Sequence, residues 1–190
     1  TIDTTLQYKL EQIAYDAITE TQAESMIMIA ADCKTGEILS YISLPSADLN
    51  DYGMASNEAK LNRPSTNAYE PGSVFKIFTV GIVTDEKGIS ANDSFLCDGA
   101  YEKRLGNGET VRIKCLEHHG WLTPREALKY SCNDVLGQIS DRISDDQFIN
   151  RIKQLGFGEK TGIELSGETP GFVKDPDNKG KLLIYKKSSK

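Results

Sequence analysis

This sequence of 190 residues lacks the features that define several classes of protein. It has no apolar run of about 18 residues, so no segment is expected to cross a membrane as a helix. It shows no signal peptide and no internal repeat. Positive charge is in deficit, because 22 lysines and arginines face 28 acidic residues. The formal charge of −6 argues against a nucleic-acid-binding surface, whereas 38% hydrophobic and 26% charged residues are ordinary for a globular protein.

A serine and a lysine stand three residues apart at the predicted start of an apolar helix. Pro71 and Gly72 end the preceding loop and place Ser73 in the first turn, where free backbone N–H groups favour a developing negative charge. Lys76 lies on the same helix face, within reach of the Ser73 hydroxyl. Residues 74–83 are apolar almost all round, which predicts a buried helix in which desolvation favours the neutral amine of Lys76. Ser73 and Lys76 are therefore a candidate nucleophile and base.

A second motif follows downstream. Thr123, Pro124 and Glu126 have the pattern of a capping box with proline at the first helical position, and the helix that they begin delivers Ser131 near its end. Asn133 completes a Ser-x-Asn pair. A Ser-x-x-Lys followed by a Ser-x-Asn is typical of serine β-lactamases and penicillin-binding proteins.

The resemblance extends over nearly the whole chain and points to class B penicillin-binding proteins, the monofunctional D,D-transpeptidases. The segments that carry it are residues 1–7, 32–39, 69–76, 119–133 and 155–168. It implies an α/β (α+β) fold of the serine β-lactamase and penicillin-binding-protein transpeptidase type, with a helical subdomain and an incomplete antiparallel sheet. The expected organisation is a helix and hairpin over 1–45, a mainly helical subdomain over 46–168, and a linker or tail over 169–190.

Local patterns predict the individual elements. Thr4 and Gln7 form a capping box, and apolar residues at helical spacing continue the first helix to about Thr21. Residues 25–31 form an apolar run expected to be a buried strand that pairs with 37–43. Residues 45–68 are expected to form a long polar loop, and residues 144–156 another capped helix closed by glycine.

Lys160, Thr161 and Gly162 spell the third motif of the family but lie only a short way after Ser131. The segment resembles a structural stretch of the fold, so Lys160 is interpreted as a decoy. The true third motif, its strand and the closing helix are expected to be absent from these residues. The membrane anchor and pedestal of the family are also expected to be absent. The resemblance places the domain at the extracytoplasmic, periplasmic face of a bacterial inner membrane.

The resemblance also implies a mechanism. Ser73 attacks the penultimate D-Ala carbonyl of a peptidoglycan stem peptide to form an acyl-enzyme, and Lys76 takes the proton of the Ser73 hydroxyl. Ser131 relays a proton to the leaving amine. Asn133 holds the substrate amide. Expected partners are stem peptides, β-lactam antibiotics and other cell-wall synthesis proteins of the parent, in division or cell shape. A serine β-lactamase and a non-catalytic β-lactam sensor or structural domain are the alternatives, although no Glu-x-x-Leu-Asn element follows Ser131.

Two of the four cysteines flank a predicted hairpin. Cys97 and Cys115 lie on either side of arms joined by a Gly-Asn-Gly turn at residues 106–108. The extracytoplasmic location that the resemblance implies permits disulfides, so a bridge between them is the first interpretation, against free thiols.

Zinc is the second interpretation of the same region. Cys97, Cys115, His118 and His119 are compatible in kind with a zinc site, and some proteins that resemble this one carry zinc near the second motif, although the spacing matches no standard zinc finger. The remaining cysteines, Cys33 and Cys132, are interpreted as structural or free.

Overall fold

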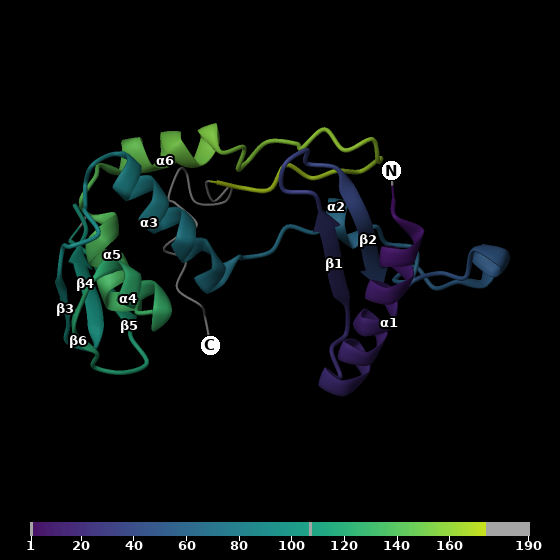
Figure 1. The fold of residues 1–190 in the computed structure, drawn as a ribbon, viewed down its shortest axis with the longest axis horizontal. Helices are drawn as coiled ribbons and strands as arrows, with labels where there is room; N and C mark the ends of the chain where they lie inside the picture. Colours follow the sequence, from purple (N-terminus) through teal and green to yellow (C-terminus); the bar gives the residue numbers. More distant parts are fainter. Residues whose placement is uncertain (1, 107, 174–190) are drawn as a thin grey trace. The chain divides into compact units, whose positions relative to one another are not determined.

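The chain divides into two compact units in the computed structural model, which describes residues 2–106 and 108–173 (Figure 1). The first, here called the sheet unit, comprises the residues up to Ala68 together with Gly162–Thr169. The second, here called the helical unit, comprises Tyr69–Thr161 and residues 170–173, as far as the structure describes them. This division differs from the expected one after residue 45, because residues 46–68 belong with the sheet unit. Most of the expected tail, from residue 174, lies outside the described residues.

The sheet unit is a helix packed on a hairpin. Helix α1 (Thr4–Thr21) precedes strands β1 (Met26–Ala31) and β2 (Ile38–Leu44), which pair antiparallel. Ala14 of α1 meets Ile42 and Leu44 of β2 in a small apolar core, as the helical spacing predicts. The described helices include none that is long and apolar enough to span a bilayer.

Two details of the sheet unit differ from expectation. Asp3, not Thr4, caps α1, because its carboxylate accepts from the Leu6 backbone N–H at 2.9 Å. The Gln7 side chain is then free to bond β2, where its Oε1 accepts from the Ser40 hydroxyl at 2.8 Å. The expected capping box is therefore wrong. Strand β1 is half-buried rather than buried, because the hairpin is covered by α1 on one face.

Residues 45–68 are more ordered than a wandering loop. They contain a 3₁₀ segment, η1 (Leu49–Met54), and a short helix, α2 (Arg63–Thr66). Arg63 is buried and donates to the Pro45 carbonyl at 3.3 Å. The Ser65 carbonyl accepts from the Thr169 backbone N–H at 2.8 Å, which ties the returning segment to this unit.

The helical unit surrounds one central helix. Its elements in chain order are η2 (Gly72–Phe75), α3 (Lys76–Asp85), β3 (Phe95–Cys97), β4 (Ala100–Arg104), β5 (Thr110–Lys114), β6 (Gly120–Leu122), α4 (Pro124–Lys129), α5 (Asn133–Ser140) and α6 (Asp145–Gln154). The strands form two antiparallel pairs, β3 with β6 and β4 with β5. Val135, Leu136 and Ile139 of α5 are buried in the main core, and α3, α4, β3 and β4 pack against this helix, whereas α6 packs against α3.

The capping signals of this unit are confirmed. Thr123 and Glu126 form the capping box of α4, with Pro124 at the first position. Ser144 and Gln147 form that of α6. Reciprocal side-chain bonds satisfy N–H groups that have no partner within the helix, which fixes where each helix begins.

The expectation of a fully buried helix after Ser73 is wrong. Ile82 and Val83 are buried in the core of the helical unit, but Val74 is 70% exposed and Ile77 is 58% exposed. The reason is geometric, since a helix side that faces no other element within its unit stays open whatever its composition.

The predicted hairpin is confirmed in β4 and β5, where Tyr101 pairs with Ile113. Asn107 of its predicted turn lies outside the described residues. The Tyr101 side chain is buried against Gly137 of α5, and its hydroxyl donates to Asp141 at 2.9 Å. A Cβ at Gly137 would collide with the Tyr101 ring, so the close approach of β4 to α5 requires glycine at this position.

This close approach gives a stability prediction. Gly137→Ala is expected to lower the free energy of unfolding by about 1–3 kcal/mol, because the added methyl group meets a ring that its own hydrogen bond holds in place. Gly81→Ala, in the exposed middle of α3 with no atom near the new Cβ, is the matched control and is expected to stabilise by up to about 1 kcal/mol. Urea unfolding curves measure both changes, and an unchanged midpoint for Gly137→Ala would contradict the prediction.

Candidate active site

The candidate nucleophile lies at the junction of η2 and α3 in the helical unit. Gly72 has φ +58, a left-handed conformation that begins the 3₁₀ turn. Ser73 follows in this turn and is exposed, and its carbonyl accepts from the Lys76 backbone N–H. The expectation that Ser73 lies in the first α-helical turn is thus corrected to a 3₁₀ turn directly before the helix.

The side chain of Lys76 reaches the loop between α4 and α5. Its Nζ lies 2.6 Å from the carbonyl oxygen of Ser131, 2.8 Å from the Ser131 hydroxyl, and 2.6 Å from Oδ1 of Asn133. Three acceptors match the three N–H donors of an ammonium group. The structure therefore brings three of the four predicted site residues into direct contact.

The turn that supplies these acceptors has an unusual backbone. Ser131 has φ +51, the left-handed region that side-chain-bearing residues rarely adopt. Cys132 caps α5 by accepting from the Val135 N–H at 3.4 Å, and the Asn133 amide donates to the Lys114 carbonyl at 2.9 Å. Bonds on both sides of Ser131 therefore hold a conformation that costs about 1–3 kcal/mol by itself.

The chemistry of the acceptors limits how protons can move. The Ser131 carbonyl and Asn133 Oδ1 accept only, so a neutral Lys76 amine would donate its two protons to them. The Ser131 hydroxyl can both donate and accept, so it is the one of the three able to give a proton to the lone pair of the amine or take one from it. The arrangement thus suits proton exchange between Lys76 and Ser131.

The pKa of Lys76 is lowered from its ordinary value of 10.5. Partial burial is the main cause, because desolvation penalises the ammonium form, and the nearby thiols of Cys115 and Cys132 act in the opposite direction. Lowering the pKa increases the fraction of neutral amine near neutral pH, which a proton acceptor requires.

Two relationships among the predicted residues are not direct contacts. Among the hydrogen bonds of the described residues, none joins the Ser73 hydroxyl to Lys76. Lys160 is exposed, and within residues 2–106 and 108–173 no hydrogen bond joins it to Ser73 or Ser131. The interpretation of Lys160 as a decoy stays a prediction.

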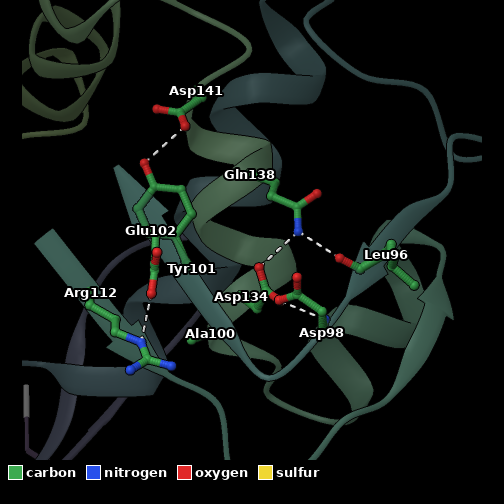
Figure 2. Close-up of a pocket in the computed structure, with 9 residues that line it drawn as sticks. All are labelled: Leu96, Asp98, Ala100, Tyr101, Glu102, Arg112, Asp134, Gln138 and Asp141. Atoms are coloured by element: carbon green, nitrogen blue, oxygen red, sulfur yellow. Dashed lines mark hydrogen bonds and ion pairs between the residues drawn. The ribbon is translucent and has the colours of Figure 1, made fainter. Parts of the chain in front are cut away.

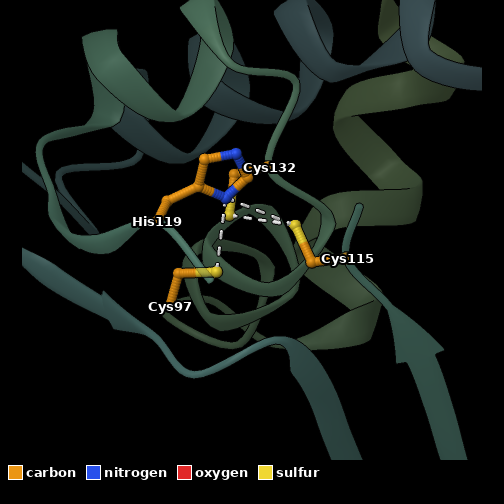
Figure 3. Close-up of side chains that lie close together, drawn as sticks. All are labelled: Cys97, Cys115, His119 and Cys132. Atoms are coloured by element: carbon orange, nitrogen blue, oxygen red, sulfur yellow. Dashed lines mark hydrogen bonds between the residues drawn. The ribbon is translucent and has the colours of Figure 1, made fainter. Parts of the chain in front are cut away.

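A thiol and imidazole cluster lies directly beside this turn. Figure 3 shows Cys97, Cys115, His119 and Cys132 pointing toward one another, and their ligand atoms all lie within 4.8 Å of one another. Nδ1 of His119 is 3.5 Å from Cys97 Sγ and 3.6 Å from Cys115 Sγ, and the sulfurs of Cys115 and Cys132 are 3.6 Å apart. Three thiols and one imidazole are a donor set of structural zinc sites.

This cluster corrects two expectations. Cys97 and Cys115 do lie close in space, as predicted, but both are free thiols, so the expected disulfide is wrong. The observed cluster also differs in one member from the expected ligand set, because Cys132 is its fourth member and His118 packs against Gly99. The sequence analysis missed Cys132 because only the fold brings the start of α5 close to β3. The position of Cys132 between Ser131 and Asn133 was the one sequence feature that linked this cysteine to the site.

The two thiols nearest the turn have opposite shifts. Burial by itself raises the pKa of Cys115, but backbone N–H groups of Asp134, Asn133 and Glu117 directed at its sulfur outweigh this and lower the pKa to about 6. Burial raises the pKa of the Cys132 thiol to about 12. The N-terminus of α5 thus favours negative charge at Cys115.

A separate polar pocket lies on the side of α5 that faces the strands (Figure 2). Its lining residues are Leu96, Asp98, Ala100, Tyr101, Glu102, Arg112, Asp134, Gln138 and Asp141. Asp134 is buried and accepts from the Asp98 N–H at 2.9 Å and the Gln138 amide at 2.8 Å. Asp141 accepts from Tyr101. Because these carboxylates are bonded to neighbouring elements, we assign them to holding β3 and β4 on α5.

Comparison with known proteins gives consistent similarities. Residues 26–186 match the family model described as the penicillin binding protein transpeptidase domain. The chain is 32% identical over 176 residues to stage V sporulation protein D of Bacillus subtilis, covering 91% of this chain and 27% of that protein. It is 28% identical over 172 residues to peptidoglycan D,D-transpeptidase FtsI of Buchnera aphidicola, covering 90% of this chain and 29% of the relative.

A solved structure extends the similarity to the fold. The transpeptidase domain of penicillin-binding protein 3 from Burkholderia pseudomallei superposes with a TM-score of 0.74 at 23% identity, covering 93% of this chain and 48% of that one. The chain thus spans between about a quarter and a half of the proteins to which it is similar. The predicted α/β fold with a helical subdomain is confirmed.

The contacts of Lys76 lead to a prediction about its pKa. Asn133→Asp keeps an oxygen beside the amine but adds a negative charge, which favours the ammonium form, so the pKa of Lys76 is expected to rise above its wild-type value. Titration of ¹³Cε-labelled lysine by NMR measures this pKa. Asn133→Ala removes the same contact without adding charge and is the matched control. A pKa in Asn133→Asp at or below the wild-type value would contradict the assignment.

Proposed function

This chain belongs to the penicillin-binding protein transpeptidase family, and from that premise we propose that it carries the reactive serine of a class B peptidoglycan D,D-transpeptidase. The observation that carries the proposal is the trio of hydrogen bonds from Lys76 to Ser131 and Asn133, which joins the two predicted motifs in one site. The name of the Buchnera relative supports the reaction class.

In the proposed reaction, Ser73 Oγ attacks the carbonyl carbon of the penultimate D-Ala of a stem peptide. The hydroxyl proton passes to the neutral amine of Lys76, whose lowered pKa suits this role. The tetrahedral intermediate collapses as the C–N bond breaks, and Ser131 passes a proton from Lys76 to the leaving D-Ala amine. The acyl-enzyme is then resolved by an amine of a second stem peptide.

The exposed position of Ser73 and the embedded position of Lys76 fit these two roles. The nucleophile must meet a polymeric substrate, and Ser73 is exposed. The base must be partly desolvated, and Lys76 is half-buried. In the apo state the Ser73–Lys76 bond is not required, since catalytic hydrogen bonds often form only when substrate is bound.

The oxyanion of the intermediate needs backbone donors. The Ser73 N–H would supply one of them, and the third motif of the family is expected to supply the other. Removing one such donor costs about 10²–10³ in rate. We therefore expect the 190 residues alone to be acylated more slowly than the complete protein.

The proposed partners follow from the reaction. They are peptidoglycan stem peptides as donor and acceptor, β-lactam antibiotics that acylate the same serine, and other cell-wall synthesis proteins. The proposed location is the extracytoplasmic face of a bacterial membrane, where this polymer is built.

Acylation by a penicillin tests the proposal directly. Incubation of the complete protein with a penicillin is expected to give one stable adduct, placed on the Ser73 peptide by mass spectrometry, and Ser73→Ala is expected to abolish it. Lys76→Arg keeps the charge but cannot act as a base, so the acylation rate constant is expected to fall by about 10²–10⁴. An adduct on Ser131 would reverse the roles, and hydrolysis of many equivalents would favour a β-lactamase instead.

The decoy interpretation of Lys160 has its own test. Lys160→Ala is expected to leave the rate constant of acylation within about twofold of wild type, because the side chain is exposed and has no described contact with either serine. Lys76→Ala, measured beside it, shows the effect of losing a lysine that touches the site. A loss of tenfold or more in Lys160→Ala would make Lys160 part of the active site.

A further inference from the structure

Three segments that are separated in the sequence deliver three thiols and one imidazole to a single point of the helical unit: the end of β3, the loop between β5 and β6, and the residue before α5. Cys97 ends β3, Cys115 follows β5, His119 precedes β6, and Cys132 precedes α5 (Figure 3). Cys97 and Cys132 are 2% and 0% exposed. The proposed transpeptidase reaction uses none of these side chains.

The spacing of the donors fits a tetrahedral zinc ion. With Zn–S bonds of about 2.3 Å and Zn–N bonds of about 2.0–2.1 Å, tetrahedral geometry places neighbouring ligand atoms roughly 3.5–3.8 Å apart. The sulfur–nitrogen distances from Cys97 and Cys115 to His119 are 3.5 Å and 3.6 Å, and the sulfurs of Cys115 and Cys132 are 3.6 Å apart. The other pairs among the four donor atoms lie within 4.8 Å, so these atoms have to approach by at most about 1 Å to close a tetrahedral shell. A disulfide needs sulfurs about 2.05 Å apart, far closer than the 3.6 Å between Cys115 and Cys132.

The surroundings of the donors suit a cation bound by thiolates. The backbone N–H groups of Asn133 and Asp134, at the start of α5, are directed at the Cys115 sulfur. The His119 ring presents Nδ1 to the thiols and stacks on Tyr130, with ring centroids 5.5 Å apart, which fixes its orientation. Binding of a zinc ion would release the thiol protons to solvent and cancel the repulsion among the thiolates.

One ligand of this cluster is a covalent neighbour of both residues that hold Lys76, and a second adjoins the residue that bonds Asn133. Cys132 lies between Ser131 and Asn133, and its sulfur already caps α5. Cys115 follows Lys114, whose carbonyl accepts from the Asn133 amide. Fixing the two sulfurs therefore fixes the peptide groups on either side of the Lys76 acceptors.

We propose that Cys97, Cys115, His119 and Cys132 bind one zinc ion, and that this ion holds Ser131 and Asn133 where they receive the Lys76 amine. The ion does not touch the substrate; Cys132 and Cys115 are positioning residues that act through the turn at Ser131. The metal site stands on the cluster alone, whereas its effect on acylation rests on the proposed function.

Metal content tests the site first. The complete protein, purified under reducing conditions and supplied with zinc chloride, is expected to hold one zinc per chain by mass spectrometry of the metal. Cobalt replacing zinc is expected to give the intense visible bands of a tetrahedral thiolate site.

Cys132→Ser and His119→Ala are expected to lower zinc affinity at least tenfold. His119→Cys retains four donors and is expected to keep the metal. Cys33→Ser, at an exposed cysteine outside the cluster, is the matched control. Zinc well below one per chain in the wild-type protein would overturn the site.

Acylation tests the positioning role. Removing zinc with a chelator is expected to lower the rate constant of acylation by a fluorescent penicillin at least tenfold while circular dichroism shows the helices retained, and zinc chloride is expected to restore it. His119→Cys is expected to acylate near the wild-type rate and His119→Ala slowly, a rescue that a loss of packing alone would not give. An unchanged rate in the folded, zinc-free protein would overturn the positioning role.

If the zinc-loaded protein is not acylated on Ser73 at all, the proposed function fails. The zinc count and the cobalt spectrum still decide whether the metal site exists.

Discussion

The arrangement of the candidate site depends on where one side-chain nitrogen is held. The Nζ atom of Lys76 is bound by the carbonyl and hydroxyl of Ser131 and by Oδ1 of Asn133 at 2.6–2.8 Å. An amine taken partly out of water must find such acceptors, because an unpaired buried charge is costly. All three acceptors come from one turn, so the position of the lysine is only as well defined as that turn.

The conformation of the turn at Ser131 depends on helix α5. Ser131 adopts a left-handed backbone conformation, which persists only where its surroundings hold it. The first residues of α5 follow at once, and Val135, Leu136 and Ile139 anchor that helix in the core. On its other side, α5 meets β4 so closely that Gly137 has no room for a side chain. Apolar packing some distance from the candidate site thus determines the position of the groups that accept from Lys76.

The site also balances two opposing electrostatic effects. Desolvation lowers the pKa of Lys76, which favours the neutral amine, while the neighbouring thiols of Cys115 and Cys132 raise this pKa. The same helix end that caps itself with Cys132 directs backbone N–H groups at Cys115. The chain therefore places the Lys76 amine and the Cys115 thiol close together, on either side of the turn at Ser131. The charge of each group influences the pKa of the other.

The sequence by itself determined the local features, because these depend on interactions between residues three or four apart. Capping boxes predict where α4 and α6 begin, and turn residues predict the β4–β5 hairpin. The two short motifs can also be read directly from the sequence. Local patterns misled where a long-range partner competed, as when Gln7 bonds Ser40 instead of capping α1. Only the tertiary structure decided that Cys132 rather than His118 completes the thiol cluster, and that Val74 and Ile77 stay exposed. Burial and ligand geometry depend on which elements meet in space, and neither periodicity nor spacing along a chain contains that information.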